Sequence, residues 1–321
     1  MATEKPMGRQ YDTKDYDWLL TLKTVPADIS LGDHLGGFDS NYRNPILDHL
    51  HEYADSPVNV CLDQVLPPVV KANYPKFRFS TELFAPMWFS LAQYRQHPAH
   101  AFQEFLCCFN GSPNPGRQML VAALQKFRFF NPTTCSKNFV LTSPNLDGLI
   151  EKFSSNRHRF FRKFFALDDA KFLNAVHSFG LVRFDHAKNI YNLEKILTSC
   201  FVNLVSECQL TSYVPFISEK FLYSVVTRGL FVTYGQPGWH DHIQKHFGFR
   251  PFTQIFDYRF DSIIDPVERL IELMTMLAKF SNLSADEWHD LYQLEIDTIE
   301  YNYHHYFSGD YVKTLTGIMH V

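Results

Sequence analysis

Short apolar runs alternate with amphipathic helical patterns over most of this 321-residue chain. The clearest series has a strand in FQEFLCCFNG ending at Gly111, a helix in GRQMLVAALQKF, and strands at 201–207 (FVNLVSE) and 230–235 (LFVTYG). Runs without a polar side are typical of strands buried on both faces, and helices between strands are typical of parallel sheets. The pattern therefore predicts an α/β fold whose parallel sheets are covered on both faces.

Capping residues mark the helix boundaries in the second half of the chain. We expect Ser218 to cap a helix that runs to about Arg228 and stops at Gly229. One long helix is expected in ADEWHDLYQLEIDTIEYNYHHYF. Gly248 is expected to end a helix in HDHIQKHF. Two further helices are expected to begin at Asp265, with Pro266 and Glu268 in the first turn, and at Ser284, with Glu287 in the first turn.

The first hundred residues carry a weaker version of the same pattern. NPILDHLHEY is helix-like, VNVCL and FRFST are strand-like, QVLPPVVKANY is irregular or helical, and residues 1–30 are predicted to be irregular. Pro98 interrupts the pattern and favours a boundary near residue 100. We therefore expect two domains, 1–100 and 101–321, and the aromatic-rich C-terminal helix is expected to pack back on the first domain or to form a dimer face.

Composition excludes several classes of protein. The hydrophobic share of 45% is enough for a large core, while a net charge of −4 argues against general nucleic-acid binding but leaves room for a local basic groove. No apolar run is long enough to span a bilayer, and the polar N-terminus does not resemble a secretion signal. Six cysteines without CxxC spacing are typical of reduced thiols, so we expect a cytoplasmic protein with Cys107 and Cys108 in its core.

Two cations follow two of the predicted strands. Lys220 lies in the first turn of the helix capped by Ser218, and Arg117 opens the helix after the loop that begins at Gly111. A cation at the positive end of a helix dipole is unfavourable unless an anion binds there. In a parallel sheet both helix starts lie at the carboxyl edge, where ligands of doubly wound folds bind, so the pair predicts a diphosphate site. The alternative is that both are ordinary solvated side chains, since neither loop matches GxGxxG or the P-loop pattern.

A longer stretch resembles a known family. FVNLVSECQLTSYVPFISEKFLYSVVTRGLFVTYGQPG is similar to the donor-binding segment of fucosyltransferase-like GT-B glycosyltransferases, and FLCCFNGSPNPGRQMLVAAL resembles that family's strand, Asn-containing loop and Arg-led helix. The segment EKFLYSVVTRGLFVTYGQPGWHDHIQKHFGFRPFTQIFDYRFDSIIDPVERL looks closer still to uncharacterised glycosyltransferase-like proteins of bacteriophages and large viruses. The resemblance covers about 105–308, and residues 1–100 match nothing in the family.

The resemblance implies a GT-B layout of two Rossmann-like domains with the donor cleft between them. It implies transfer of a sugar from a UDP- or GDP-sugar held by residues 101–321, without a metal, while residues 1–100 would form the acceptor side. The donor-binding residues that it implies are Asn110, Gly111, Arg117, Glu207, Ser218, Glu219 and Lys220. Among them Arg117 and Lys220 match the phosphate-binding cations, and Glu219 matches the carboxylate near the ribose.

An inverting transferase also needs a base that deprotonates the acceptor hydroxyl. SLGDHLGGFDSNY offers Asp33, His34 and Asp39 around two glycines, although a cluster of this composition is also typical of a turn. Asp63, after VNVCL, is a weaker candidate of the same kind. We interpret the DxD-like Asp15–Asp17 as chance, and the pairs His242/His246 and His304/His305 as helix-surface or core-edge residues rather than metal ligands.

The sequence does not decide which molecule accepts the sugar. NRHRFFRKFF holds the one basic cluster, Arg157, Arg159, Arg162 and Lys163, which would suit a nucleic-acid backbone, although its Phe residues also fit a core-facing helix stripe. The viral resemblance and this cluster favour hydroxymethylated DNA as the acceptor, whereas the acidic net charge favours an acceptor other than DNA, such as a glycan, a lipid or a protein. A non-catalytic module that binds a nucleotide or another polyanion is the alternative to an enzyme.

Overall fold

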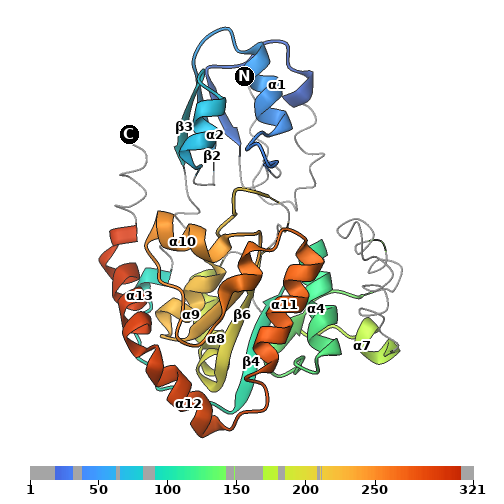
Figure 1. Ribbon diagram of the computed structural model, residues 1–321, viewed down its shortest axis with the longest axis vertical. Helices are drawn as coiled ribbons and strands as arrows, with labels where there is room; N and C mark the ends of the chain where they lie inside the picture. The colour runs from blue at the N-terminus through green and yellow to red at the C-terminus, as the bar shows by residue number, and fades with distance from the viewer. Residues whose placement is uncertain are drawn as a thin grey trace. The chain divides into compact units, whose positions relative to one another are not determined.

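The computed structural model describes residues 19–31, 38–62, 66–81, 91–141, 148, 169–179, 185–207, 210 and 212–311 (Figure 1). The chain divides into two compact units. Unit 1 comprises residues 1–83 with Ser212–Val214, and unit 2 comprises 84–211 with 215–321. The predicted boundary at residue 100 lies inside unit 2, and each unit is described below by itself.

Unit 1 is a small parallel α/β layer. In its described part the sheet has the order β1-β2-β3, and every neighbouring pair is parallel. The strands and helices are β1 (Asp28–Leu31), α1 (Pro45–Tyr53), β2 (Val58–Leu62), α2 (Pro68–Asn73) and β3 (Phe77–Thr81). Three of these were expected as such; β1 lies where the sequence predicts irregular chain, because a four-residue strand gives too short a pattern to detect.

A distant segment completes the core of unit 1. Val214 is fully buried in the same hydrophobic cluster as Leu47, Val60 and Val70. The backbone N–H of Tyr213 donates to the carbonyl of Phe38 at 3.1 Å, and Ser212 Oγ accepts from the N–H of Phe38 at 3.2 Å. The three residues 212–214 therefore belong to unit 1, although the chain on either side of them belongs to unit 2.

Unit 2 contains a larger parallel sheet. In its described part the strand order is β5-β4-β6-β7, and all pairs are parallel. The strands are β4 (Glu104–Asn110), β5 (Cys135–Lys137), β6 (Cys200–Ser206) and β7 (Leu230–Tyr234). Every residue of β6 is buried, as expected for a central strand covered on both faces. The predicted α/β class with two parallel sheets is confirmed.

Helices cover both faces of this sheet (Figure 1). Tyr234 Oη donates to the carbonyl of Pro266 at 2.9 Å, so this side of the sheet faces α11 (Pro266–Ala278), which packs on α4 (Pro115–Lys126). Asn203 Nδ2 donates to Ser224 Oγ at 2.8 Å on the opposite side, which faces α9 (Leu222–Val226) and α8 (His186–Ser199). The remaining elements are η2 (Leu91–Gln93), α7 (Ala170–Asn174), η3 (Glu219–Phe221), α10 (Trp239–Phe247), η4 (Tyr258–Ser262), α12 (Ala285–Leu294) and α13 (Ile296–Ser308).

The N-caps predicted at Asp265 and Ser284 are present, but the one helix predicted from Ser284 onward is two helices. Asp265 accepts the N–H groups of Val267 and Glu268, and Ser284 forms a reciprocal capping box with Glu287. The single helix expected from Ser284 onward was wrong, because the chain turns at Glu295 (φ −100°, ψ 9°) between α12 and α13. Both helices pack within unit 2, α12 on β6 and α13 on α9. In the described part of the chain, no helix combines the length and apolarity needed to cross a membrane.

Candidate functional site

The topology of unit 2 defines where a ligand site is expected. From β4 the chain passes through α4 to β5 on one side of the sheet, whereas from β6 it passes through α9 to β7 on the other side. The connections therefore diverge at the carboxyl ends of β4 and β6. Open parallel sheets bind ligands in this place. We call the residues around these strand ends the carboxyl-edge site.

A buried carboxylate lies directly after β6. Glu207 is 0% exposed, and its Oε1 accepts the N–H of Ser218 at 3.0 Å and the Ser218 hydroxyl at 2.8 Å. Lys220 Nζ donates to Ser218 Oγ at 2.8 Å and lies 3.6 Å from Glu207 Oε2. The Lys220 side chain remains 24% exposed. These three residues form one network in which an ammonium group balances a carboxylate that water does not reach.

This network explains why a lysine follows Ser218. Lys220 lies in the 3-10 turn η3, and only five residues of α-helix follow it, so the predicted helix from Ser218 to about Arg228 is shorter than expected. Arg228, with φ 56°, is the left-handed residue that ends α9, and the N–H of Gly229 donates to Ser224 O at 2.7 Å. The helix therefore ends where predicted, but an arginine takes the backbone conformation expected of Gly229.

The same network excludes a simple Ser–Lys nucleophile. The Ser218 hydroxyl donates its proton to Glu207, and Lys220 donates to the Ser218 oxygen. Ser218 is also only 2% exposed. Lys220 donates to the Ser218 oxygen and does not accept the hydroxyl proton, so it is not placed as the base that an activated serine needs. The backbone of Glu219 lies in η3, and its side chain is outside the described atoms.

The β4 side of the site has a different construction. α4 is twelve residues long, begins with Pro115, and has no side-chain cap from Asn114. Arg117 is 5% exposed, and its Nη1 donates to Ser112 Oγ. A Cβ on Gly111 would meet no heavy atom within 4 Å, so the loop is open at that point. This half therefore offers a full helix N-terminus beside a guanidinium group.

Buried polar atoms without hydrogen bonds gather at this edge. In the described structure Asn110 Oδ1 and Ser206 Oγ have no hydrogen-bond partner, although the two residues are 0% and 1% exposed. They are the last residues of the adjacent strands β4 and β6. Glu207 Oε2 next to them has no hydrogen bond either. Since buried polar atoms are nearly always satisfied in folded proteins, this concentration indicates a place where a ligand or water completes the bonding.

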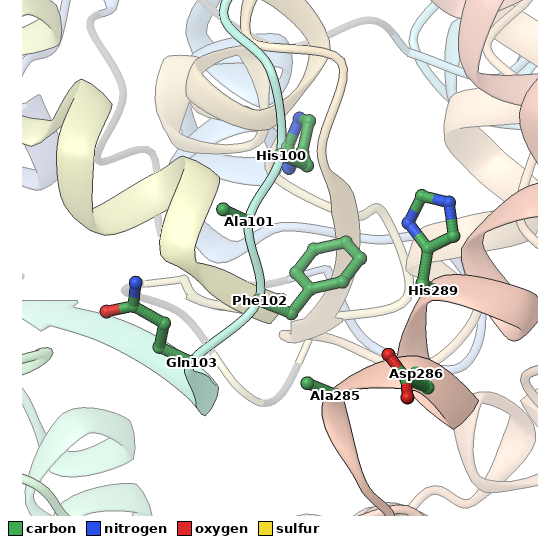
Figure 2. A pocket seen from close by; sticks show the side chains of 7 residues that line it. All are labelled: His100, Ala101, Phe102, Gln103, Ala285, Asp286 and His289. Atoms are coloured by element: carbon green, nitrogen blue, oxygen red, sulfur yellow. The ribbon is translucent and has the colours of Figure 1, made fainter.

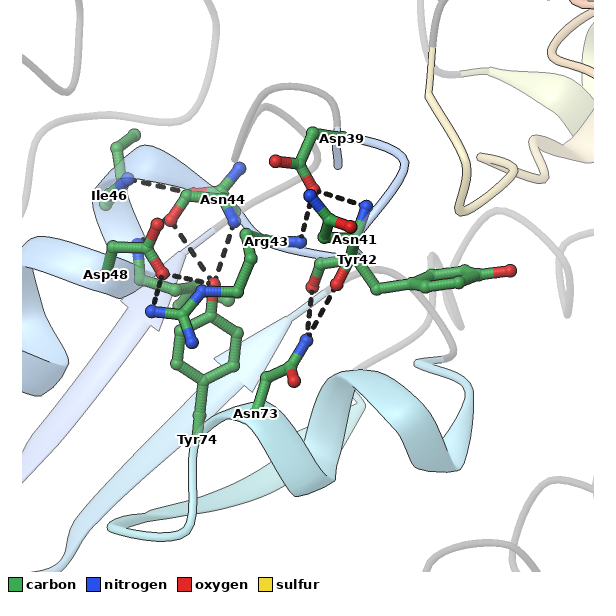
Figure 3. A network of polar contacts seen from close by, with 10 residues as sticks. Asp39, Asn41, Tyr42, Arg43, Asn44, Ile46, Asp48, Asn73 and Tyr74 are labelled. Atoms are coloured by element: carbon green, nitrogen blue, oxygen red, sulfur yellow. Dashed lines mark hydrogen bonds and ion pairs between the residues drawn. The ribbon is translucent and has the colours of Figure 1, made fainter.

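The base candidates of the first domain fall into two groups. Asp39 lies in unit 1, where its Oδ1 accepts the N–H groups of Asn41 at 2.9 Å and Arg43 at 2.8 Å (Figure 3). These bonds are those of an Asx-type turn, the alternative weighed for this loop. Asp33, His34 and Asp63 lie outside the described residues. So do Asp15, Asp17 and the basic cluster Arg157, Arg159, Arg162 and Lys163.

The histidine pairs lie at the core edge or on the helix surface, since the His304 side chain is 73% exposed and His242 is buried. His242 is 7% exposed, and its ring centroid lies 4.4 Å from that of His246. Burial, with a smaller effect of His246, lowers the pKa of His242 to about 3, so the ring is neutral. His305 contacts the carbonyl of Phe247 at 2.7 Å, and His304 lies 3.6 Å from Glu300. Within the ranges that the structure describes, no group of three or more His, Cys, Asp or Glu side chains is arranged to hold a metal ion.

Sequence reasoning missed two buried cations at the same edge. Lys137 ends β5 beside Asn110, and its Nζ donates to the carbonyls of Phe139 at 2.9 Å, Leu173 at 3.2 Å and Ala175. Burial lowers the pKa of Lys137. Because its contacts with Leu173 and Ala175 lie at the end of α7, Lys137 ties the C-terminal end of this helix to the sheet. Arg269 is the second such cation; its position on the apolar stripe of α11, among Val267, Leu270 and Leu273, was the signal that could have drawn attention to it.

A shallow pocket lies at the opposite, amino-terminal end of β4 (Figure 2). It has a volume of about 250 Å³ between residues 100–103 and three residues of α12, namely Ala285, Asp286 and His289. His100 Nε2 contacts Thr227 O at 2.8 Å, and burial lowers the pKa of the ring. Asp286 and His289 are exposed. None of the sequence-predicted site residues lines this pocket.

Comparison of the chain with protein-family models, with curated proteins and with solved structures finds no significant match.

Proposed function

We propose that the chain is a glycosyltransferase of the GT-B type that binds a nucleotide-sugar at the carboxyl-edge site of unit 2. The observation that carries the proposal is the concentration of buried, incompletely bonded polar atoms at the point where the connections of a parallel sheet diverge. Arg117 follows β4 and Asn110 in the sequence, and Lys220 follows β6, Ser206 and Glu207. Arg117 and Lys220 suit a diphosphate, whereas the acceptor atoms Asn110 Oδ1 and Glu207 Oε2 suit the hydroxyl groups of the ribose or of the attached sugar.

The two cations would stabilise the leaving group. In the transfer, the bond between the sugar C1 and the phosphate oxygen breaks, and a bond between C1 and the acceptor oxygen forms. Negative charge then develops on the departing nucleoside diphosphate, where a helix N-terminus, a guanidinium and an ammonium are favourable. We assign this role to the start of α4, to Arg117 and to Lys220.

The acceptor proton needs a base. Asp33 and His34 remain the candidates. Asp39 is less suited, because two backbone amides already bind its Oδ1. This occupancy of Asp39 favours the second candidate function, a module that binds the nucleotide without transferring a sugar. The acceptor, a glycan or hydroxymethylated DNA, is decided only by assay.

Release of free nucleoside diphosphate tests the proposal. Wild type is incubated with UDP- and GDP-sugars, first alone and then with a glycan mixture or with hydroxymethylated DNA. A transferase releases UDP or GDP faster when its acceptor is present, and Lys220→Gln slows this release, whereas the surface variant Lys245→Gln does not. Thermal stabilisation by a nucleotide without any release would support the binding module. Neither stabilisation nor release with any donor would refute both functions.

A further inference from the structure

Arg269 is a buried arginine whose side chain contacts several loops. It lies in the first half of α11 and is 1% exposed. Burial lowers the pKa of its guanidinium, while Tyr234, Asp261 and Asp265 act in the opposite direction. A charged group is rarely placed in a core unless its donors are fully used.

The guanidinium donates to carbonyl oxygens from three loops. Nη2 donates to Leu210 O at 2.7 Å in the loop after β6, and Nε donates to Gly235 O at 3.0 Å in the loop after β7. Nη1 donates to Ile263 O and, at 3.1 Å, to Ile264 O in the loop before α11. A planar fork with several donors can reach carbonyls in different directions, whereas the single nitrogen of a lysine cannot.

The Leu210 contact reaches the β4 half of the site. A Cβ on Gly116 would lie 2.8 Å from Leu210 Cδ2, so the Leu210 side chain packs against the first turn of α4. Arg117 is the next residue of that turn. By fixing the Leu210 carbonyl, Arg269 fixes the side chain on which the start of α4 packs.

The Gly235 contact reaches the β6–β7 half. A Cβ on Gly235 would lie 3.4 Å from Glu207 Cγ and 3.0 Å from Trp239 Cδ1. The backbone of Gly235 therefore packs directly on the carboxylate side chain that binds Ser218 and pairs with Lys220. One guanidinium thus holds the neighbours of both cation-bearing segments.

We infer that Arg269 is the positioning residue of the carboxyl-edge site, setting the spacing between the Arg117 segment and the Glu207–Ser218–Lys220 network that a diphosphate must bridge. The nucleotide part of this inference rests on the proposed function. The loop-positioning part rests on the contacts of Arg269 alone. A residue that only stabilised the fold would lower the melting temperature without changing the affinity of the folded protein.

The test compares Arg269→Lys with Arg259→Lys. The Arg259 side chain is 87% exposed and pairs with Asp257. Binding of UDP and GDP is measured by calorimetry well below each variant's melting temperature, and amide hydrogen exchange is followed in residues 205–218 and 233–240. We expect Arg269→Lys to bind about tenfold more weakly than wild type and to exchange faster in these two segments. Arg259→Lys is expected to match wild type in both measurements.

A second variant separates positioning from folding. Leu210→Ala keeps the carbonyl contact and removes only the packing on Gly116, so we expect weaker nucleotide binding with normal exchange around Gly235. It also provides the test if Arg269→Lys does not fold. Wild-type affinity and wild-type exchange in folded Arg269→Lys, or unchanged affinity in Leu210→Ala, would overturn the inference. If wild type binds neither UDP nor GDP, the nucleotide assignment fails, and the exchange measurement alone decides whether Arg269 positions the loops.

Discussion

The two halves of the carboxyl-edge site look alike in sequence and differ in structure. Each has a strand, a loop and a cation close to the start of a helix. On the β4 side, Arg117 lies in the first turn of a twelve-residue helix that packs against Leu210. On the β6 side, Lys220 lies in a 3-10 turn before a five-residue helix and balances the buried Glu207.

A cation near a strand end therefore has two physical explanations. A helix dipole matters only where several turns of helix follow, which holds for α4 and not for α9. A buried carboxylate needs a counter-charge whatever the secondary structure. We therefore expect the stability of the β4 half to depend on side-chain packing and that of the β6 half to depend on the Lys220–Glu207 pair. The following predictions test this contrast.

The largest effect is expected from removing the charge of Lys220. Lys220→Met leaves the buried Glu207 carboxyl group without its partner cation, and we expect the free energy of unfolding to fall by about 3 kcal/mol. This value is at the low end for a broken buried pair because the Lys220 side chain is 24% exposed. In a Glu207→Gln background the same change should cost less than about 1 kcal/mol. Urea unfolding of the four proteins gives the coupling energy. Equal costs in both backgrounds would show that the β6 half does not depend on this pair.

On the β4 side a change of shape is expected to matter. Gly116→Val drives a side chain into Leu210, and overpacking of this kind lowers the free energy of unfolding by about 1–3 kcal/mol. Gly111→Ala is the matched control, since no atom lies within 4 Å of its Cβ position, and it should change stability by less than about 0.5 kcal/mol. The account fails here if Gly116→Val is as stable as wild type or if both changes cost the same.

Acid is expected to lower the free energy of unfolding through His242, which lies in α10, the helix that follows β7. Its pKa is about 3 in the folded protein and about 6.5 in the unfolded chain, so between these values only the unfolded chain binds the proton. The stability that the neutral ring contributes is fully present above about pH 6.5 and decreases by up to about 1.4 kcal/mol per pH unit below it. His242→Leu should lower the difference in bound protons between the unfolded and folded states by about one, and so flatten the plot of the free energy of unfolding against pH. An unchanged slope would contradict a buried, neutral His242.

The smallest effect is expected from an exposed ion pair on the same helix. Lys245 and Asp241 in α10 lie 2.7 Å apart, and their side chains are 65% and 59% exposed. Lys245→Ala should change the free energy of unfolding by no more than about 0.5 kcal/mol and leave nucleotide binding unchanged. A loss comparable with that of Lys220→Met would mean that charge on this helix matters irrespective of burial.

The sequence was sufficient for the elements with long, regular patterns. β4, β6 and β7 are apolar runs of five to seven residues, and the caps at Asp265 and Ser284 are local interactions that neighbouring residues determine. β1 and β5, of four and three residues, are too short to carry a periodic signal. Glu295, where one predicted helix divides into two, lies within an unbroken helical pattern and offers no local breaker.

The chemistry of the site was harder to predict for a different reason. The pattern around Lys220 indicated a ligand-binding cation, but whether a buried carboxylate lies beneath it depends on how the loop after β6 folds back toward β6. Arg269 contacts carbonyl oxygens, which every residue possesses, so no residue type in the sequence identifies its partners. The spacing of residue types in the sequence therefore does not predict tertiary contacts to backbone carbonyls.

A diphosphate site at the carboxyl edge is tested by calorimetric titration of UDP, GDP, UMP and GMP into wild type, Lys220→Gln and Lys245→Gln. We expect wild type and Lys245→Gln to bind one diphosphate at least about tenfold more tightly than its monophosphate, and Lys220→Gln to lose this preference while remaining folded. Equal affinity of wild type for mono- and diphosphates, or a preference that Lys220→Gln retains, would contradict a diphosphate site at the carboxyl edge.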